Sequence, residues 1–127
     1  DCSDPLNSKY YMVVVQYTAR LVASKLTNTV MNLKPQDQRL PRGKFSLQVA
    51  LEETGLKLTG FPHNGVCPLG SVAEGVPVVI SEALLSLRPA SVWMGGGHPL
   101  LKLMLSVQDL VRCIGDRAFV ADISDPR

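Results

Sequence analysis

Aromatic residues are scarce in this sequence. Phe, Trp and Tyr make up 6% of its 127 residues, with a single tryptophan. A hydrophobic core must therefore rely on Val, Leu, Ile and Met, and the 46% hydrophobic content is enough for one domain over residues 1–127. No apolar run reaches the ~18 residues of a membrane span, and no basic segment precedes an apolar one as in a secretory signal. A net charge of +2 neither requires nor excludes a polyanionic partner.

Cysteine is also rare. Cys2, Cys67 and Cys113 are odd in number and far apart, which argues against a disulfide framework and for a reducing, cytoplasmic setting. No Cys-x-x-Cys pair occurs, and only His63 and His98 could add soft ligands to these thiols. Because a zinc site needs three or four supported ligands, we expect no metal and no cofactor.

Two other kinds of site fit the sequence poorly. The glycines at 95–97 are followed by Pro99 and an apolar alternation, whereas a phosphate-binding loop leads into a helix. A nucleophilic role for Cys67 is disfavoured because Pro68 follows it directly and no strand-to-helix elbow presents the thiol.

Local patterns predict strands and helices without strict alternation, which favours a mixed α+β domain over a doubly wound sheet. Apolar or alternating runs predict strands at 10–17, 76–81, 91–94, 100–106 and 118–124. A further short strand is expected from Phe45, leading into a helix. Helical spacing, an N-cap at Ser106 and C-cap glycines at Gly60 and Gly115 predict helices: 21–33, 51–58, 82–88 and 106–115.

Three segments are candidates for function. "HNGVCPLG" (63–70) and "MGGGHPLLK" (94–102) are two turns that each combine glycine, histidine and proline. The loop 34–44 carries Lys34, Arg39, Arg42 and Lys44 against one acid, Asp37. Such a loop is either a solvated face or a contact for nucleic-acid phosphates, which would raise affinity without reading sequence.

The order of several segments resembles the YbaK/ProX family of aminoacyl-tRNA deacylases, which includes the editing domain of bacterial prolyl-tRNA synthetases. The resemblance runs from about Tyr10 to Ile123 and is strongest over 59–123. It is carried by these segments: "LTGFPHNGVCPLG", "VPVVISEALL", "VWMGGGHPLLKLMLS", "VQDLVRCIG" and "FVADI". The family's G-x-x-x-P loop corresponds to residues 64–68, where Asn64 replaces the first glycine. Asn tolerates positive φ better than other side chains.

This resemblance implies a YbaK-like mixed, barrel-like β-sheet surrounded by helices. It also implies metal-free hydrolysis of a mischarged tRNA, with tRNA for proline carrying alanine or cysteine as the favoured substrate. Loop backbone groups would hold the aminoacyl-adenosine while a water, assisted by the substrate's ribose hydroxyl, attacks the ester. The residues implied at this site are Gly65 and His98 as catalytic, and Asn64, Val66, Cys67, Pro68, Gly96 and Gly97 as substrate-binding. We expect the two turns to face each other across a small pocket, with the basic loop on the same side contacting tRNA.

One departure from the family leaves alternatives open. The family carries a functional lysine on a strand before the one at 10–17, and neither Lys9 nor Lys102 matches that position. We therefore expect that one or more N-terminal strands lie outside this sequence or have been lost. A catalytically inactive module that binds tRNA or an aminoacyl-tRNA synthetase stays an alternative, as does a small-molecule-binding domain. His98 is either a residue that limits the size of the aminoacyl group or an ordinary turn histidine.

Overall fold

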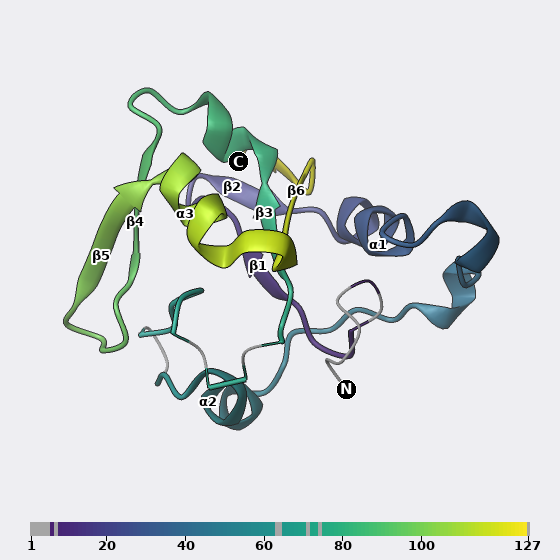
Figure 1. The fold of residues 1–127 in the computed structure, drawn as a ribbon, viewed down its shortest axis with the longest axis horizontal. Helices are drawn as coiled ribbons and strands as arrows, with labels where there is room; N and C mark the ends of the chain where they lie inside the picture. Colours follow the sequence, from purple (N-terminus) through teal and green to yellow (C-terminus); the bar gives the residue numbers. More distant parts are fainter. Residues whose placement is uncertain (1–5, 7, 63–64, 71, 74, 127) are drawn as a thin grey trace.

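A three-stranded parallel sheet forms the centre of the fold (Figure 1). The computed structural model describes residues 6, 8–62, 65–70, 72–73 and 75–126. Within these ranges the sheet has the order β1-β3-β6, and Val13 pairs with Val79, which pairs with Phe119. The sheet consists of β1 (Met12–Val14), β3 (Val78–Ser81) and β6 (Ala118–Ala121).

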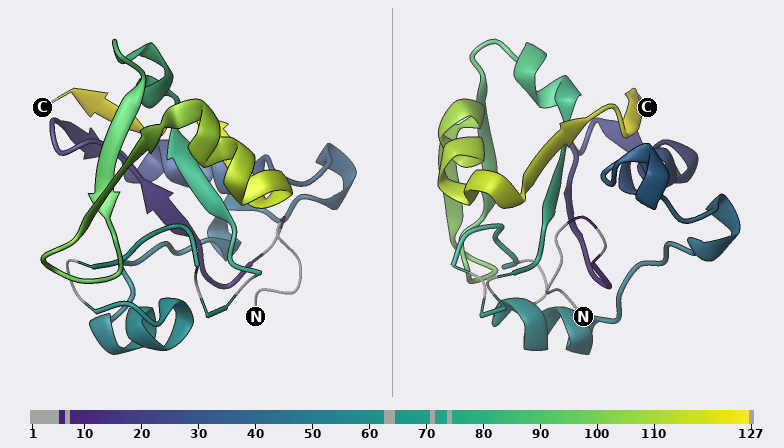
Figure 2. Two further views of the ribbon diagram at one scale, coloured as in Figure 1. Left: turned by 60° about the vertical axis from the view of Figure 1, so that its left-hand side comes forward. Right: turned by 45° about the vertical axis from the view of Figure 1, so that its right-hand side comes forward.

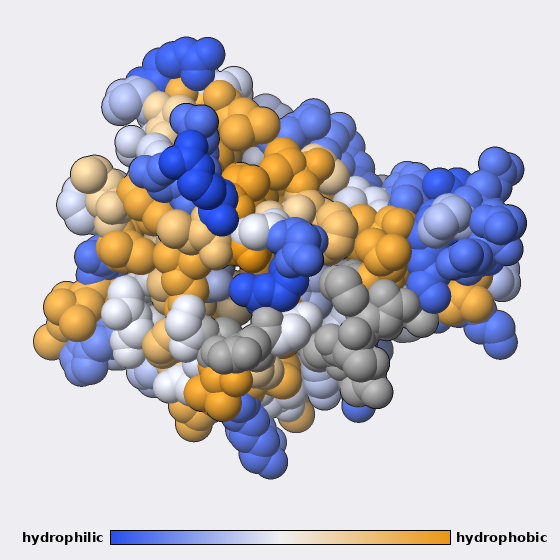
Figure 3. Space-filling model, viewed as in Figure 1, coloured by the Kyte–Doolittle hydropathy of each residue, from blue (hydrophilic) through white to orange (hydrophobic). Residues whose placement is uncertain are grey.

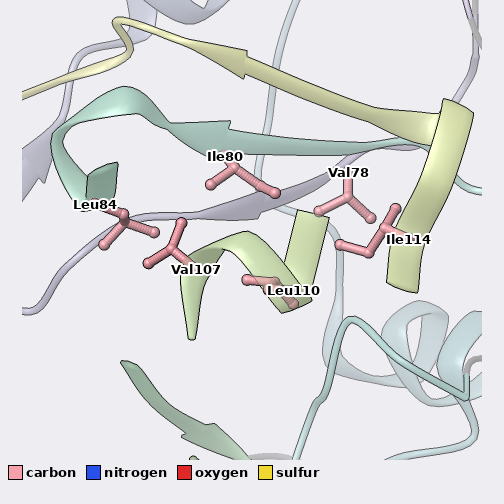
Figure 4. Packing of buried hydrophobic residues seen from close by; sticks show 6 residues of the cluster. All are labelled: Val78, Ile80, Leu84, Val107, Leu110 and Ile114. Carbon is pink, nitrogen blue, oxygen red and sulfur yellow. The ribbon is translucent and has the colours of Figure 1, made fainter. Parts of the chain in front are cut away.

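The two faces of β3 are covered by different helices. Val78 and Ile80 pack against α3 (Val107–Ile114), and Figure 4 shows these side chains meeting those of α3 and Leu84. Val79 points to the opposite face, where it packs against Leu26 and Val30 of α1 (Ala23–Met31). Side chains of a strand alternate between faces, so a β3 composed only of apolar residues and one serine suits a strand buried on both sides.

A two-stranded antiparallel hairpin leads into α3. It consists of β4 (Ser91–Gly95) and β5 (Lys102–Ser106). The Ser106 side chain caps the helix by accepting a hydrogen bond from the Asp109 amide at 3.0 Å. At the other end Gly115, with φ of 77°, stops the helix. The hairpin and α3 are therefore one continuous unit, held to the preceding segment by a hydrogen bond from the Val107 amide to the Ala90 carbonyl (2.9 Å).

The remaining elements are short. β2 (Ala19–Leu21) pairs antiparallel with β7 (Ser124–Pro126), and α2 (Glu52–Thr59) ends at Gly60, whose φ is 78°. Four 3₁₀-helices are present among the described residues: η1 (Gln36–Gln38), η2 (Arg42–Lys44), η3 (Glu82–Ser86) and η4 (Gly115–Arg117). None of the helices in the described ranges is both long and apolar enough to cross a bilayer.

The mixed α/β architecture confirms the expected class, whereas no closed barrel forms in the described part of the chain. In the described part of the chain the strands form separate sheets, because β1 and β6 are the edges of the central sheet and neither bonds to β2–β7 or β4–β5. The expected strand at Phe45 is also absent: residues 45–50 have no strand partner there and are mostly exposed. The expected helix at 82–88 is the 3₁₀-helix η3, and the expected strand 118–124 is divided into β6 and β7.

An exposed charge cluster ties α1 to the C-terminal segment. The Lys25 ammonium lies 2.7 Å from Asp125 and 3.1 Å from Asp122. The hydrogen bond from Lys25 lowers the pKa of Asp125 below its ordinary value, and the hydrogen bond to Asp125 raises the pKa of Lys25. A lowered carboxyl pKa contributes stability above pH 3.8, the ordinary value, which is lost as the pH falls through the folded-state pKa.

We therefore expect that Lys25→Gln loses less stability than the wild type as the pH falls below 3.8, the ordinary carboxyl pKa. Urea unfolding of the wild type and the variant, followed by circular dichroism at several pH values, measures this difference. Lys57→Gln is the matched control, because Lys57 is exposed and has no ion pair in the part of the chain that the structure describes. Equal pH dependence of Lys25→Gln and Lys57→Gln would contradict the expectation.

Candidate functional site

The two glycine-containing turns touch each other. The Gly97 amide donates a hydrogen bond to the Gly65 carbonyl at 2.8 Å. A Cβ on Gly95 would come within 2.2 Å of the Val66 carbonyl oxygen, and a Cβ on Gly65 within 2.9 Å of the His98 nitrogen. Only glycine permits such a close approach of two backbones. The turns therefore meet through their backbones at this point, and a hollow lined by residues of both turns lies beside the contact.

Local structure explains how each turn reaches this contact. The second turn connects β4 to β5 and is closed by hydrogen bonds from the Gly96 amide to the Leu101 carbonyl (3.1 Å) and from the Leu101 amide to the His98 carbonyl (2.9 Å). The first turn follows the glycine C-cap of α2. Phe61, next to that cap, lies against the second turn, since a Cβ on Gly97 would be 3.3 Å from its ring.

Backbone donors are left over at this contact. Within the described ranges, the amides of Val66, Cys67 and His98 donate to no acceptor. Gly65 and Cys67 are buried, whereas Val66 is exposed. Unpaired amides are available to a ligand oxygen, and such donors stabilise the negative charge that develops when an ester carbonyl is attacked.

A hollow lies on each side of the contact. The first has a volume of about 400 Å³ and is lined by Cys67 and Gly96 together with neighbours: Phe61, Leu69, Gly70 and residues 101–103. The second is a groove of about 480 Å³ between residues 12–17 and residues 92–95, with Val66, Pro68 and Leu84 completing its lining. Cys67 lines the first hollow and Val66 lines the second groove. A residue with an unpaired backbone amide therefore belongs to the lining of each.

His98 is exposed at the tip of the second turn. Its Nδ1 accepts a hydrogen bond from the Leu100 amide at 3.1 Å, which fixes the ring relative to the turn. Nε2 is then the ring nitrogen left for a ligand. His63 and Asn64, the other polar side chains expected at this site, lie outside the described residues.

The basic loop lies at the other end of the molecule. In the views of Figures 1 and 2 the segment 34–44 projects on the side opposite to the β4–β5 hairpin. Figure 3 shows this end as largely hydrophilic. The Arg39 side chain donates to the Lys34 carbonyl (2.9 Å), and that of Arg42 donates to Asn28 of α1. The prediction that the loop and the turns share one side is wrong, because α1 carries the loop away from the sheet.

Two aromatic side chains of the groove were not predicted as site residues from the sequence. Trp93 is 71% exposed and Tyr17 is 97% exposed, and both line the second groove. The available signal was the alternation in β4, where Trp93 lies between Val92 and Met94 and so points away from the core face. In the described chain no cluster of three or more His, Cys, Asp or Glu side chains is placed to hold a metal ion.

Comparisons with known proteins bear on the fold. No family model and no curated protein matches the sequence. A solved structure of a candidate trans-editing enzyme for prolyl-tRNA synthetase matches 91% of this chain with a TM-score of 0.71 and 29% identity. The likeness supports a YbaK-like fold. A scaffold from work on epitope backbone grafting by computational design also matches 91% of the chain, with a TM-score of 0.70 and 28% identity. The chain spans 62% and 65% of these two proteins, respectively.

Proposed function

We propose that this chain is a metal-independent aminoacyl-tRNA deacylase of the cytoplasm. It would act as a single editing domain that hydrolyses alanine or cysteine wrongly esterified to tRNA for proline. The observation that carries the proposal is the likeness, over 91% of the chain, to a candidate trans-editing enzyme for prolyl-tRNA synthetase. The leftover amides at the contact between the two turns support it, because ester hydrolysis needs donors for a developing oxyanion.

In the proposed reaction a water oxygen bonds to the ester carbonyl carbon, and the substrate's free ribose hydroxyl relays a proton, accepting one from the water as it gives up its own. The ester C–O bond then breaks, and the departing ribose oxygen takes up the relayed proton. Gly65 serves through its backbone, which shapes the turn, and the amide of Val66, a residue that lines the groove, faces the carbonyl oxygen. Cys67 contributes its backbone to the other side of the same turn. Asn64, Pro68, Gly96 and Gly97 complete the walls that hold the aminoacyl-adenosine. The buried Cys67 thiol takes no part in this reaction.

The test is a deacylation assay with tRNA for proline charged with alanine, cysteine or proline. We expect loss of the alanyl or cysteinyl ester, with the prolyl ester largely spared and the rate unchanged by a chelator. A rate that falls with chelator and returns with zinc would contradict the metal-free mechanism. Binding of the charged tRNA without cleavage would instead favour the inactive module that binds tRNA or a synthetase.

His98→Ala tests the role of the exposed histidine. If His98 borders the aminoacyl side chain, its removal should relax discrimination between small and larger aminoacyl groups by about 1–3 kcal/mol per methylene-sized difference. A general base would behave differently and lose about 10²–10⁴-fold in rate on every substrate. Rates for the alanyl and prolyl esters with both proteins separate these outcomes, and unchanged rates would make His98 an ordinary turn residue.

The basic loop is proposed to contact tRNA phosphates at a distance from the turns. Replacing Lys34, Arg39, Arg42 and Lys44 by Gln should weaken binding about equally for all tRNA species and flatten the dependence of affinity on salt. Filter binding at several salt concentrations measures both effects. Lys57→Gln, on α2, is the control for loss of a positive charge elsewhere. An unchanged salt slope in the fourfold variant would show that the loop is a solvated face.

A further inference from the structure

The groove between β1 and β4 carries two aromatic side chains that are largely exposed in the structure. Trp93, on β4, is 71% exposed and Tyr17, in the turn between β1 and β2, is 97% exposed, and both line one groove of about 480 Å³. Exposed aromatic rings of this size are costly to leave in water and are enriched where a ligand stacks on them. Since aromatic residues make up only 6% of the chain, the groove gathers two of its few aromatic rings with both open to solvent.

The backbone holds Trp93 on the outer side of β4. Its neighbours Val92 and Met94 pack against the main core, so the alternation of the strand directs the indole away from it. Across the hairpin it pairs with Met104, which is itself 53% exposed, so most of the indole remains accessible to solvent. The ring is therefore fixed at its base by the hairpin, while its face stays open to solvent.

The groove is continuous with the site proposed above and has no charge that would repel a nucleic acid. Val66 and Gly95 belong both to its lining and to the contact between the turns. No Asp or Glu is among the described residues that line it. A polynucleotide with unpaired bases could thus lie with its bases on the aromatic rings and its end at the leftover amide of Val66.

We propose that this groove binds the unpaired 3′ end of an RNA, with terminal bases stacked on Trp93 and Tyr17; this inference rests on the proposed function. Each base offers a flat face that stacks on an aromatic ring, independent of sequence. Stacking would bring the ribose of the last nucleotide, which carries the ester, next to the turns. Trp93 and Tyr17 are then positioning residues, which hold the substrate without taking part in the hydrolysis.

Trp93 is the only tryptophan of the chain, so its fluorescence reports on this groove directly. The probe is a short single-stranded RNA that ends in CCA and carries no amino acid, titrated into the full chain. We expect saturable quenching that is absent when the same RNA is annealed to its complement. With a labelled RNA and anisotropy as readout, Trp93→Ala and Tyr17→Ala should each weaken binding about 5- to 100-fold. Trp93→Phe should retain most of the affinity. Leu100→Ala is the control, because Leu100 is 86% exposed on the same hairpin and lies outside the groove lining.

The outcomes separate this inference from the proposed function. One outcome is that the protein shows no deacylation while RNA still quenches Trp93 fluorescence and the Trp93→Ala and Tyr17→Ala variants bind RNA more weakly. That result would support RNA binding in the groove and contradict the proposed deacylase activity. Deacylation that is unaffected by Trp93→Ala, with no quenching by RNA, would overturn the groove alone. Quenching by an extended Val/Thr peptide with lysine ends, but not by RNA, would also overturn it. Such a result would show that a peptide strand binds the edge of β1, which pairs only with β3 in the described chain.

Discussion

Gly95→Ala is expected to open the contact between the two turns. The new Cβ would lie 2.2 Å from the Val66 oxygen and 3.0 Å from the Gly65 carbonyl carbon, and both are backbone atoms that cannot rotate away. Forcing them apart should destabilise the protein by about 1–3 kcal/mol, the usual cost of overpacking. It should also move the leftover amide of Val66, and loss of one such donor typically lowers the rate of acyl transfer by about 10²–10³-fold.

Urea unfolding and the deacylation assay measure these two effects in the same protein. Gly55→Ala is the matched control: a Cβ there meets nothing within 4 Å, and Gly55 lies inside α2. That control should leave the rate unchanged and stabilise the helix by about 1 kcal/mol, since alanine favours helix over glycine. Full stability and full activity in Gly95→Ala would show that the turns do not need to touch.

Leu110→Ala should have the largest effect on stability. Leu110 is fully buried (0% exposed) on the face of α3 that packs against Val78 and Ile80. Removing its side chain leaves a cavity between helix and sheet, which costs about 2–5 kcal/mol. Since α3 continues directly from the hairpin, the variant should also loosen the second turn and lower activity as the folded fraction falls.

The same substitution at an exposed position controls for the loss of a leucine. Leu100→Ala, at a side chain that is 86% exposed, should change stability by no more than about 0.5 kcal/mol. Chemical denaturation with both tryptophan fluorescence and circular dichroism compares the two variants. Near-equal stability of Leu110→Ala and Leu100→Ala would contradict the core described here.

Elements with strong local signals were predicted well from the sequence. The apolar run of β3, the period-two pattern of β5, and α3 with its serine N-cap and glycine C-cap each depend on neighbours in the chain. β2 and β7 could not be found in this way. Each has three residues, and they pair with partners about a hundred positions away, as Leu21 does with Ser124. No local preference encodes such a pairing.

The candidate site was predictable only in part. Glycine and proline located both turns, because these residues mark tight backbone geometry. The contact between the turns depends on how α2 and the β4–β5 hairpin are placed relative to each other. Tertiary packing sets that placement, and local sequence patterns do not encode it. The alternation Phe45, Leu47, Val49 predicted a strand, yet in the described chain this segment finds no edge to pair with, and Val49 is 96% exposed. Pattern alone therefore does not decide whether a strand forms.

The order of strands in the central sheet has a consequence for synthesis and folding. β3 pairs with β1, more than sixty residues earlier, and with β6, about forty residues later. While the chain is being translated, α1 and α2 can form from local contacts, but β3 has no complete sheet to join until residue 121 has left the ribosome. Pairings this distant in sequence slow folding, because loop closure comes before any gain from contacts. During that interval β3 still lacks β6 along one edge, so a chaperone that shields extended apolar strands would find β3 accessible on the nascent chain but not on the folded protein, where β3 is the central strand.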